Sequence, residues 1–391
     1  MNYNFDEHID RSATHALKWM ELERFWGRTD LLPLWVADMD FRTPPFIIET
    51  LKQRLEHEVL GYTCPHEGYF RAITEWNRKQ YGIAVRKEEI KYVPGVVSGI
   101  YLALQALTEK GDRILIQQPV YHPFAFVPEA SERIIVNSPL RWNNGTFEMD
   151  LDDLDRRIEG CRMMILCNPH NPGGIVWPAE VLRRVAEIAA AHGVTVVSDE
   201  IHCDMLLGDR KHIPFASVSE TARRISITLQ SPTKTFNMPG IVAAHALVFD
   251  EALRRRYFHY VEQSDMDLGN VFAFPCVEAA YTQGEEWKRQ MLDYVQSNID
   301  YVEQFLQNHL PAIRPIRPQA SFLVFLDCRG LGFGTQEELE HFFADKAHLA
   351  LNSGTLFGPG GKGFMRLNVG CPRHTLEQAM QQLQAAYASM E

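Results

Sequence analysis

The middle of the chain alternates between short β-rich apolar runs and helical patterns. Each run holds four to six apolar residues with almost no interruption, which is typical of strands that are covered on both faces of a sheet. The runs lie at 113–119, 133–139, 162–169, 194–200, 225–231 and 244–249. Because helical patterns separate several of them, we predict an α/β protein with a mainly parallel sheet and helices on both faces.

Two of the helical patterns carry start and stop signals. Residues 178–193 begin with Pro178, which suits the first helical position, and end at Gly193. Residues 97–111 form a mostly apolar pattern that also ends in glycine. We therefore predict a helix in each of these two segments, between predicted strands of the sheet.

The pattern changes after about residue 280. A long polar helical pattern at 285–310 leads into strand-like runs at 320–327 and 363–370. A chain of 391 residues is also too long for one small core. We expect a second, smaller α+β domain in this part of the chain.

The expected domain boundaries follow from this change of pattern. We place a large domain at 46–280 and a small carboxyl-terminal domain at 281–391. An amino-terminal arm, residues 1–45, is expected to join the small domain, so that both chain ends form it. The prolines that predict irregular chain in this part are Pro33, Pro44 and Pro45.

Charge and composition argue against several classes of partner. The chain has 39 basic and 50 acidic residues and a net charge of −11, which repels nucleic acid and anionic lipid. No apolar stretch reaches the roughly 18 residues that span a bilayer, and the amino terminus lacks the apolar core of a signal peptide. Seven scattered cysteines form no CxxC motif, so we expect reduced thiols and a cytoplasmic location rather than a disulfide framework.

Polar residues follow the apolar runs at four places. In a doubly wound sheet, ligands bind outside the carboxyl ends of the strands. Tyr121, Asn171, Asp199 and Lys234 each lie just past an apolar run. These four residues are therefore the first candidates for an active site.

Asp199 has three competing interpretations. A carboxylate at a strand end is most often solvated or caps a helix. A magnesium-binding acid of the Walker-B type requires a GxxxxGK[ST] phosphate loop, which the sequence lacks. A metal cluster in DEIHCD (199–204) would have to use neighbouring residues whose side chains point in different directions, so we predict no metal site.

Lys234 lies four residues past a predicted strand, among Ser, Pro, Thr and Asn residues. Most lone lysines are solvated surface residues. A lysine that attacks a carbonyl must instead be partly neutral, in an apolar pocket or near another cation. If it faces Asp199, Lys234 fits pyridoxal phosphate (PLP), whose aldehyde needs a lysine and whose ring nitrogen needs an anion.

Two other strand-end residues suit the PLP ring. Asn171, in NPHNPGG, can donate an amide hydrogen bond to the phenolic oxygen O3′, although Asn-Pro also favours turns on its own. Tyr121, in QPVYHPF, can stack on the ring face, although ordinary half-buried packing is the alternative. Each signal is weak singly, and the prediction rests on their occurring together.

The phosphate group and the substrate need further partners. Backbone N–H groups at a helix start, in PGVVSG at Gly95, Val96 and Val97, can bind phosphate together with the hydroxyl of Ser231. Arg366, in GFMRLNVG, can hold the carboxylate of a small amino-acid substrate. Taken alone, an arginine there would be interpreted as half of a surface ion pair.

These residues resemble those of the fold-type I PLP enzymes, the aspartate-aminotransferase superfamily. A closer resemblance is to the MalY/PatB group of carbon–sulfur β-lyases, which includes cystalysin. The motifs that carry it are PLWVADMDF (33–41), SDEIHCD (198–204), HIPFAS (212–217), SPTKTFNMPG (231–240) and RLNVGCPR (366–373). The resemblance extends over nearly the whole chain. It implies an aminotransferase-like fold whose large PLP-binding domain has a mainly parallel seven-stranded sheet.

The resemblance also implies roles for the candidate residues. Lys234 matches the lysine that forms a Schiff base with PLP, and Asp199 matches the partner of the pyridinium nitrogen. Asn171 matches the O3′ donor and Tyr121 the stacking aromatic ring. Arg366 matches the arginine that binds the substrate carboxylate.

Further positions are implied by the resemblance alone. His202 stands where many relatives place a tyrosine near O3′. Tyr62, in LGYTCP, matches a tyrosine that reaches the phosphate of the neighbouring subunit, which implies a homodimer with shared active sites. Trp35 and Val36 match an arm segment that lines the substrate pocket. Val242 stands where many aminotransferases carry a phosphate-binding arginine, which argues against a standard transaminase.

The reaction that this resemblance implies is a PLP-dependent β-elimination. A general base removes the α-proton of a sulfur-containing amino acid, and the products are a thiol, pyruvate and ammonia. Cystathionine, cystine and S-substituted cysteines are all possible substrates. Two alternatives stay open: an aminotransferase that uses the same residues, and a regulatory protein of low turnover that keeps the fold.

Overall fold

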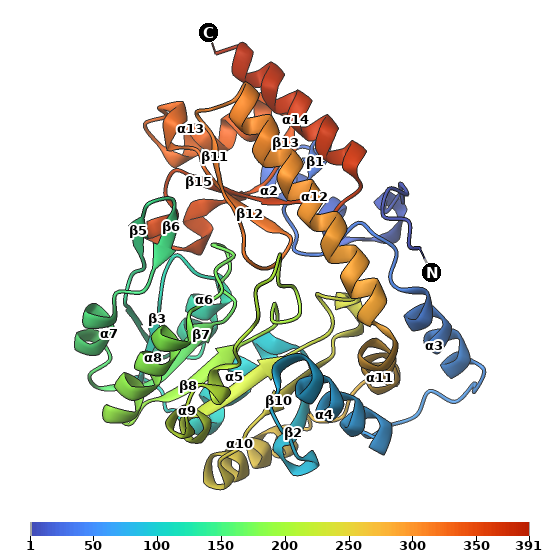
Figure 1. The fold of residues 1–391 in the computed structure, drawn as a ribbon, viewed down its shortest axis with the longest axis vertical. Coiled ribbons are helices and arrows are strands. Elements are labelled where there is room, and N and C mark those ends of the chain that lie inside the picture. Colours follow the sequence, from blue (N-terminus) through green and yellow to red (C-terminus); the bar gives the residue numbers. More distant parts are fainter. Residues whose placement is uncertain (1, 391) are drawn as a thin grey trace.

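The computed structural model describes residues 2–390 and is built around a seven-stranded sheet (Figure 1). In spatial order the strands are β2 (Ile90–Val93), β10 (Ala244–Leu247), β9 (Ser226–Gln230), β8 (Thr195–Asp199), β7 (Cys161–Cys167), β3 (Arg113–Ile116) and β4 (Ile134–Asn137). Neighbours from β9 to β4 run parallel, and β10 runs antiparallel to both β9 and β2. The prediction of a mainly parallel seven-stranded sheet is confirmed.

The strand β2 is the one that the sequence pattern missed. It has only four residues, IKYV, and Lys91 interrupts its apolar pattern. It lies at the edge of the sheet, where its partner is the antiparallel strand β10. Three of its four residues are buried, so the weak signal comes from its short length and from Lys91 rather than from exposure.

Helices cover both faces of this sheet because side chains alternate between the two faces of a strand. Leu115 of β3 packs into a core on one face, whereas its neighbours Ile114 and Ile116 pack into a core on the other. The covering helices are α7 (Leu151–Arg157) and α8 (Ala179–Ala191) on the first face, and α5 (Val96–Leu107) and α10 (Glu251–Gln263) on the second. The two helices predicted from the sequence are α8 and α5, and each ends earlier than predicted.

A four-stranded antiparallel sheet forms the other part of the molecule, above the large sheet in Figure 1. In spatial order its strands are β11 (Arg314–Ile316), β12 (Leu323–Asp327), β15 (Phe364–Asn368) and β14 (Asn352–Ser353). The helices α12 (Glu285–His309) and α14 (Arg373–Ala388) lie side by side along it. The predicted long helix is α12, and the two predicted strand-like runs contain β12 and β15.

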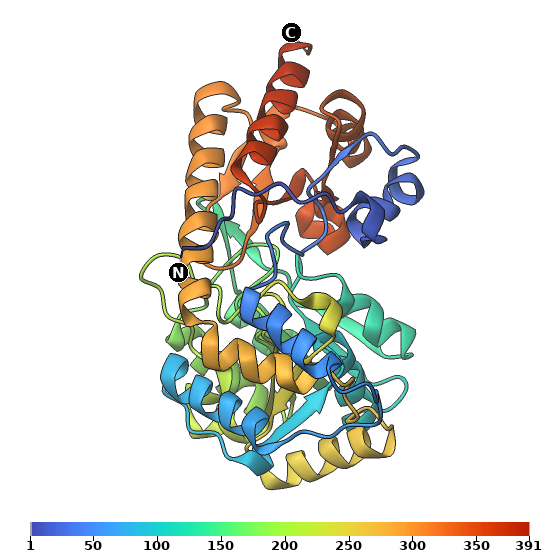
Figure 2. The same ribbon diagram turned by 90° about the vertical axis from the view of Figure 1, so that its right-hand side faces the viewer.

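The amino-terminal arm packs against this smaller sheet and its helices (Figure 2). Its strand β1 (Leu32–Pro33) pairs in parallel with β13 (Leu349–Ala350). The prediction of irregular chain is therefore wrong at Pro33, which lies in a strand. It is also wrong at Pro45, which begins α3 (Pro45–Leu55). Proline is tolerated at the first helical position because its missing N–H would have no partner within the helix.

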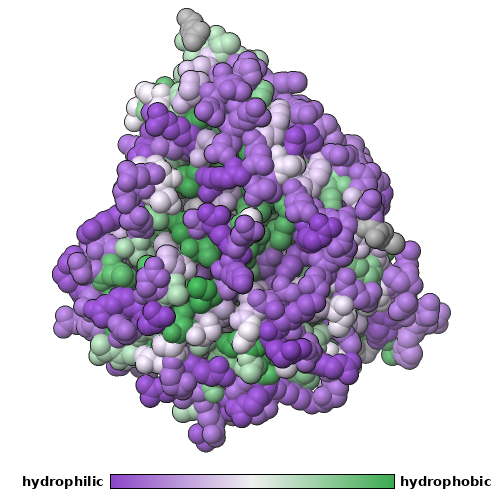
Figure 3. Space-filling view, viewed as in Figure 1, coloured by the Kyte–Doolittle hydropathy of each residue, from purple (hydrophilic) through white to green (hydrophobic). Residues whose placement is uncertain are grey.

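The surface is mostly hydrophilic on the face shown in Figure 3, where hydrophobic residues form small separate groups. Within residues 2–390, no helix combines the length and the apolar character that a membrane span requires. Six of the seven cysteines are buried, Cys64 is exposed, and all seven are free thiols.

Candidate active site

A cavity of about 220 Å³ lies at the carboxyl ends of the strands of the large sheet. Asp199 is the last residue of β8, and Lys234 follows the end of β9 by four residues. The predicted residues that line the cavity are Gly95, Val96, Val97, Tyr121, Asn171, Asp199, His202 and Lys234. Segments more than 100 residues apart in the chain thus meet in one cavity.

Lys234 is held by the amino-terminal arm. Its Nζ donates a hydrogen bond to the backbone carbonyl of Ala37, at 2.5 Å. Burial lowers the pKa of Lys234 to about 8, with a further contribution from Arg366, while Asp38 and Asp199 act in the opposite direction. A large fraction of the amine is therefore neutral near pH 8, which is the state a nucleophile or general base requires.

Asp199 lines the same cavity as Lys234 and is buried, with 4% of its surface exposed. Its Oδ1 accepts a hydrogen bond from the backbone N–H of Ile201 at 3.0 Å. Burial raises the pKa of Asp199 to about 7, against the lowering effects of that hydrogen bond and of Lys234. A carboxylate in this setting is stabilised by any cation that enters the cavity beside it.

The buried carboxyl group predicts a pH-dependent stability in the ligand-free protein. The folded-state pKa of about 7 exceeds the unfolded value of about 4, so the folded protein binds more protons between these values. The free energy of unfolding therefore falls as pH rises from about 4 to about 7. We expect Asp199→Asn to be more stable than wild type at pH 8 by about 2–3 kcal/mol, with the difference vanishing near pH 4.

Denaturation of ligand-free wild-type and variant protein from pH 4 to pH 8.5 measures this difference. The exposed Asp209→Asn serves as the matched control and should follow the wild-type profile at every pH. A constant difference between Asp199→Asn and wild type across this range would contradict the raised pKa of Asp199.

Arg366, on β15, is a buried guanidinium without an acidic partner among the described residues. It donates hydrogen bonds to Asn171 Oδ1 at 3.2 Å, Trp35 O at 3.1 Å and Asn352 Oδ1 at 2.6 Å. Its Nε is buried and has no hydrogen-bond partner in the part of the chain that the structure describes. Burial lowers the pKa of Arg366 to about 10, so an incoming carboxylate would be strongly stabilised here.

Asn171 and Tyr121 are tied together by their backbones. The N–H of Tyr121 donates to the carbonyl of Asn171 at 3.0 Å. The N–H of Asn171 donates to Cys167 Sγ at 3.3 Å, and its side-chain Oδ1 is used by Arg366. Within residues 2–390 the structure records no hydrogen bond for the amide nitrogen of Asn171, so this donor is available to a ligand.

His202 is a neutral side chain of the cavity wall. Burial lowers its pKa to about 3, and Lys234 and Arg366 add to the effect. Its Nδ1 is buried and has no hydrogen-bond partner among the described residues. A buried polar atom without a partner is unfavourable in the free protein, and a bound ligand can supply the missing partner.

The start of α5 forms the remaining wall. Gly95 precedes the helix with a φ of +100°, a conformation that side-chain-bearing residues rarely adopt. The N–H of Gly95 itself donates to Val93 O at 2.8 Å, whereas those of Val96 and Val97 belong to the first helical turn, which has no intrahelical partners. Ser98, which also lines the cavity, was not predicted.

Residues 29–383 of the chain match the family described as aminotransferase class I and II. The chain belongs to this family. The cystathionine β-lyase PatB of Bacillus subtilis (strain 168) is 40% identical over 385 residues, which cover 98% of this chain and 99% of PatB. The resemblance inferred from the motifs is confirmed.

Solved structures give the same assignment. Cystalysin from Treponema denticola, which contains a pyridoxal 5′-phosphate cofactor, has a TM-score of 0.96 and 28% identity, with 100% of both chains covered. The PLP-bound C-S lyase from Staphylococcus hominis has a TM-score of 0.92 and 30% identity, covering 99% of this chain and 98% of that one. The predicted aminotransferase-like fold is confirmed.

The predicted residues that lie outside the cavity lining are Arg366, Trp35, Val36, Tyr62 and Ser231. The hydroxyl of Ser231 donates to Ala243 O at 2.7 Å and accepts from Thr233 N at 3.1 Å, so within one chain it is already satisfied. Tyr62 is 99% exposed, on the loop between α3 and α4 (Glu67–Tyr81). The carbonyl of Val36 accepts a hydrogen bond from Asn368 Nδ2 at 2.6 Å.

The acidic motif after β8 separates into different environments, as neighbouring side chains must. Glu200 is buried and accepts hydrogen bonds from Ser198 Oγ at 3.0 Å and Phe215 N at 2.8 Å. Asp204 accepts from Trp76 Nε1 at 2.8 Å. Only Asp199 and His202 of this motif's polar residues line the cavity, within the part of the chain that the structure describes.

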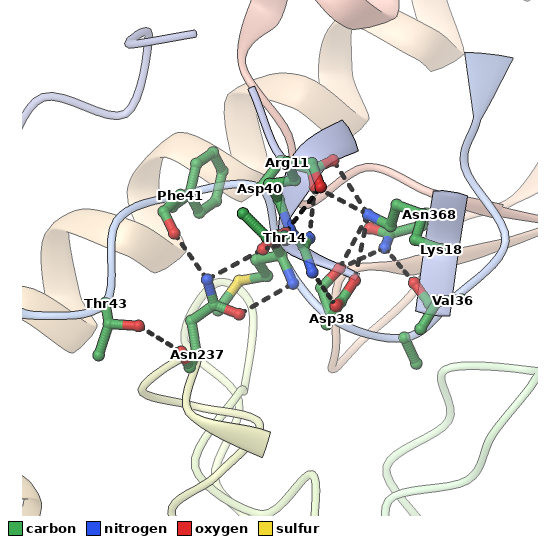
Figure 4. A network of polar contacts seen from close by, with 12 residues as sticks. Arg11, Thr14, Lys18, Val36, Asp38, Asp40, Phe41, Thr43, Asn237 and Asn368 are labelled. Carbon is green, nitrogen blue, oxygen red and sulfur yellow. Dashed lines mark hydrogen bonds and ion pairs between the residues drawn. The ribbon is translucent and has the colours of Figure 1, made fainter. Parts of the chain in front are cut away.

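Sequence reasoning missed a partly buried charge network in the arm, shown in Figure 4. Lys18 has 1% of its surface exposed, and its Nζ lies 3.2 Å from Asp38 and 3.0 Å from Asp40. Arg11 binds the same two carboxylates at 2.5 Å and 2.7 Å. No spacing rule links these four residues, because they meet only through the path of the arm.

Two asparagines connect the network to the active-site elements (Figure 4). Asn237, three residues past Lys234, donates to the carbonyls of Met39 and Phe41 at 2.9 Å and 2.7 Å. Asn368, two residues past Arg366, donates to the carbonyls of Val36 and Asp38. The arm segment 35–41 is thereby held between the lysine loop and the arginine strand.

Replacement of Lys18 with methionine is expected to destabilise the protein by about 2–4 kcal/mol. The change leaves two half-buried carboxylates with Arg11 as their remaining cationic partner among the described residues. Thermal and denaturant unfolding measure the effect. Lys110, which is 72% exposed in a surface pair with Glu132, is the control, and Lys110→Met should change stability by less than about 0.5 kcal/mol. Equal effects of the two changes would contradict a stabilising network.

Proposed function

We propose that this protein is a PLP-dependent carbon–sulfur β-lyase. The observation that carries the proposal is that Lys234 and Asp199 line one buried cavity, beside a guanidinium that lacks an acidic partner among residues 2–390. PatB, which is 40% identical, is named a cystathionine β-lyase, and the Staphylococcus hominis protein is a C-S lyase. The substrate is a small amino acid that carries a thioether or disulfide on Cβ.

The residues of the cavity fit PLP. Its aldehyde requires an amine that is partly neutral, and the pKa of Lys234 is about 8. Its ring nitrogen requires an anion, which Asp199 provides. The unpartnered Nδ1 of His202 and the unused N–H groups at the start of α5 provide polar contacts for the remaining oxygen atoms.

Each cavity residue then has a proposed role. Lys234 would carry the aldehyde, Asp199 would face the ring nitrogen, and Tyr121 would stack on the ring. Asn171 and His202 would contact the phenolic oxygen. The phosphate would bind at the N–H groups of Val96 and Val97, next to Gly95, with the partner's tyrosine as a further proposed contact. The Ser231 hydroxyl would join them by exchanging its hydrogen bond to Ala243 O for one to the phosphate.

The reaction requires a base, an anchor and an electron sink. PLP, when bound, supplies the electron sink for the carbanion at the substrate Cα. Arg366 anchors the substrate carboxylate, and the carbonyl of Val36 lies in the arm segment next to this anchor. Lys234 accepts the α-proton as a general base. The Cβ–S bond breaks with its electron pair on sulfur, and one water completes the balance to thiol, pyruvate and ammonia.

The test is the assay of purified, PLP-loaded protein with L-cystathionine in the absence of any keto acid. We expect stoichiometric pyruvate, ammonia and thiol. Turnover that appears only when 2-oxoglutarate is added would replace this proposal with an aminotransferase. Full PLP loading without turnover on any thioether would favour the regulatory alternative.

We further propose a homodimer with shared active sites. Tyr62 is fully exposed in the single chain and lies beside two exposed apolar residues, Val59 at 65% and Leu60 at 58%. An exposed tyrosine with apolar neighbours is the composition that interfaces favour. Sedimentation should give twice the chain mass. Mixing inactive Lys234→Ala chains with weakened Tyr62→Ala chains should restore activity, and a mixture no better than its components would refute shared sites.

We also propose a cellular location and a domain division for the protein. Seven free thiols suit the cytoplasm, where cysteines stay reduced. The division into an arm and small domain (1–45 and 281–391) and a large domain (46–280) places the lysine and the arginine on different domains. Cell fractionation tests the cytoplasmic location, and limited proteolysis tests the division into domains.

A further inference from the structure

A second cavity, of about 350 Å³, is lined by Trp35 and Asn352, which both accept hydrogen bonds from Arg366. We call it the aromatic cavity. Its side chains come from the arm, from the elements around the small sheet and from the start of α6 (Pro123–Ala130) in the large domain. Those used below are Phe25, Trp26, Trp35, His122, Glu340 and Leu356. Trp35 contacts Trp26 and Phe25 edge to face, with ring centroids 5.3 Å and 5.4 Å apart. The aromatic wall is therefore already assembled in the free protein.

The aromatic cavity adjoins the active site at three points. Asn352 lines it and accepts a hydrogen bond from Arg366 at 2.6 Å. Trp35 lines it, and its carbonyl accepts another hydrogen bond from Arg366. His122 lines it and directly follows Tyr121, which lines the active-site cavity. A substrate held by its carboxylate on Arg366 thus lies at the border of both cavities.

The lining of the aromatic cavity is mostly apolar and includes one acidic side chain. Glu340 is the sole charged side chain among its described lining residues, and none of them is a lysine or an arginine. Burial lowers the pKa of His122 to about 4, so this histidine is neutral at physiological pH. Arg24 lies over the outer face of Phe25, but it is paired with Glu21 at 3.0 Å and does not line the cavity.

We infer that the aromatic cavity receives the S-substituent of the substrate and selects cysteine thioethers with an apolar or aromatic substituent over cystathionine. This inference rests on the proposed β-lyase activity. The transfer of an apolar ring from water to a wall of aromatic side chains is favourable in free energy. The far end of cystathionine instead carries a carboxylate and an ammonium group. The carboxylate would find no cation there, because Arg366 is occupied by the α-carboxylate, and it would face Glu340.

The first experiment compares three thioethers with the PLP-loaded enzyme by pyruvate release. S-benzyl-L-cysteine, S-methyl-L-cysteine and L-cystathionine all release alkyl thiols, so differences among them report binding of the substituent more than leaving-group chemistry. We expect kcat/KM for the benzyl compound to exceed that for each of the others by about tenfold or more, mainly through a lower KM. Equal or better use of cystathionine would overturn the inference.

The second experiment alters the cavity wall. Phe25 is 57% exposed, so Phe25→Ala is expected to keep the fold, and it should lower the benzyl-to-methyl ratio of kcat/KM about three- to tenfold. Leu17 is equally exposed, at 57%, in the same arm but outside the cavity lining, and Leu17→Ala should leave the ratio unchanged. Leu356→Ala, at another exposed lining position, provides an independent variant. An unaltered ratio in both cavity variants would refute the assignment.

The third experiment adds the missing cation. Glu340→Lys is expected to raise the cystathionine-to-benzyl ratio of kcat/KM by about tenfold, because it places a cation where the distal carboxylate has none in the wild type. No change in this ratio would place the distal end of the substrate elsewhere. The two proposals fail separately: no pyruvate from any thioether refutes the β-lyase function, whereas pyruvate from all three without these preferences refutes only the aromatic cavity as the S-substituent site.

Discussion

Replacement of Lys234 with alanine is expected to lower pyruvate release from a thioether amino acid by at least about 10²–10⁴-fold, the range for loss of a positioned general base. The loss should exceed the upper end of this range, because the same amine is also the proposed attachment point of PLP. The physical basis is the buried position of Nζ, which lowers its pKa to about 8 and holds it against the Ala37 carbonyl.

Two measurements separate a chemical from a structural effect of this change. Borohydride treatment followed by mass spectrometry should show PLP bound covalently to wild type and not to Lys234→Ala. Thermal stability of the ligand-free variant should equal or exceed that of wild type, because a buried amine has been removed. Lys110→Ala, at a site 72% exposed, is the control and should keep wild-type turnover. Covalent PLP in the Lys234→Ala protein would contradict the assignment.

Replacement of Arg366 with methionine is expected to lower kcat/KM by about 10²–10³-fold, as for removal of one partner of a buried, hydrogen-bonded charge pair. The guanidinium is 4% exposed and has no carboxylate partner among the described residues, so its charge is available to the substrate. Arg366→Lys should have a kcat/KM only slightly above that of Arg366→Met, because an ammonium cannot reproduce the fork of donors that binds a carboxylate.

The matched control for Arg366 is Arg329, two residues past the end of the adjacent strand β12. Arg329 is 46% exposed and paired with Asp327 at 2.7 Å, and Arg329→Met should leave kcat/KM near the wild-type value. Arg366→Met should also leave stability unchanged or raise it, because it removes an uncompensated buried charge. An unchanged kcat/KM with a large loss of stability would make Arg366 a structural residue rather than a substrate anchor.

The strand pattern was predictable because central strands of a parallel sheet must be apolar on both faces. This rule located six of the seven strands of the large sheet and failed at β2, an edge strand that contains Lys91. Proline positions predicted the secondary structure less well. It predicted irregular chain at Pro33 and Pro45, where the structure has a strand and the first turn of a helix.

The candidate site was predictable in part for a similar reason. Strand ends of one sheet meet at one edge, so Asn171, Asp199 and Lys234 were expected near each other, and they line one cavity. Ala37 and Cys167 were not expected in that lining, because an alanine and a buried cysteine carry no distinctive sequence signal. Ser231 was expected there, but its hydroxyl is satisfied by Ala243 and Thr233.

The amino-acid sequence by itself determined the elements and the chemistry available at their ends, because apolar periodicity and residue type are local properties. Only the tertiary structure decided how those groups behave. Burial sets the pKa of Lys234 near 8 and that of Asp199 near 7, and Arg366 is buried without an acidic partner in the part of the chain that the structure describes. The network around Lys18 exists because the arm folds back on itself between residues 11 and 40. The aromatic cavity exists because the arm folds onto strands more than 300 residues away, and no local pattern encodes a contact at that distance.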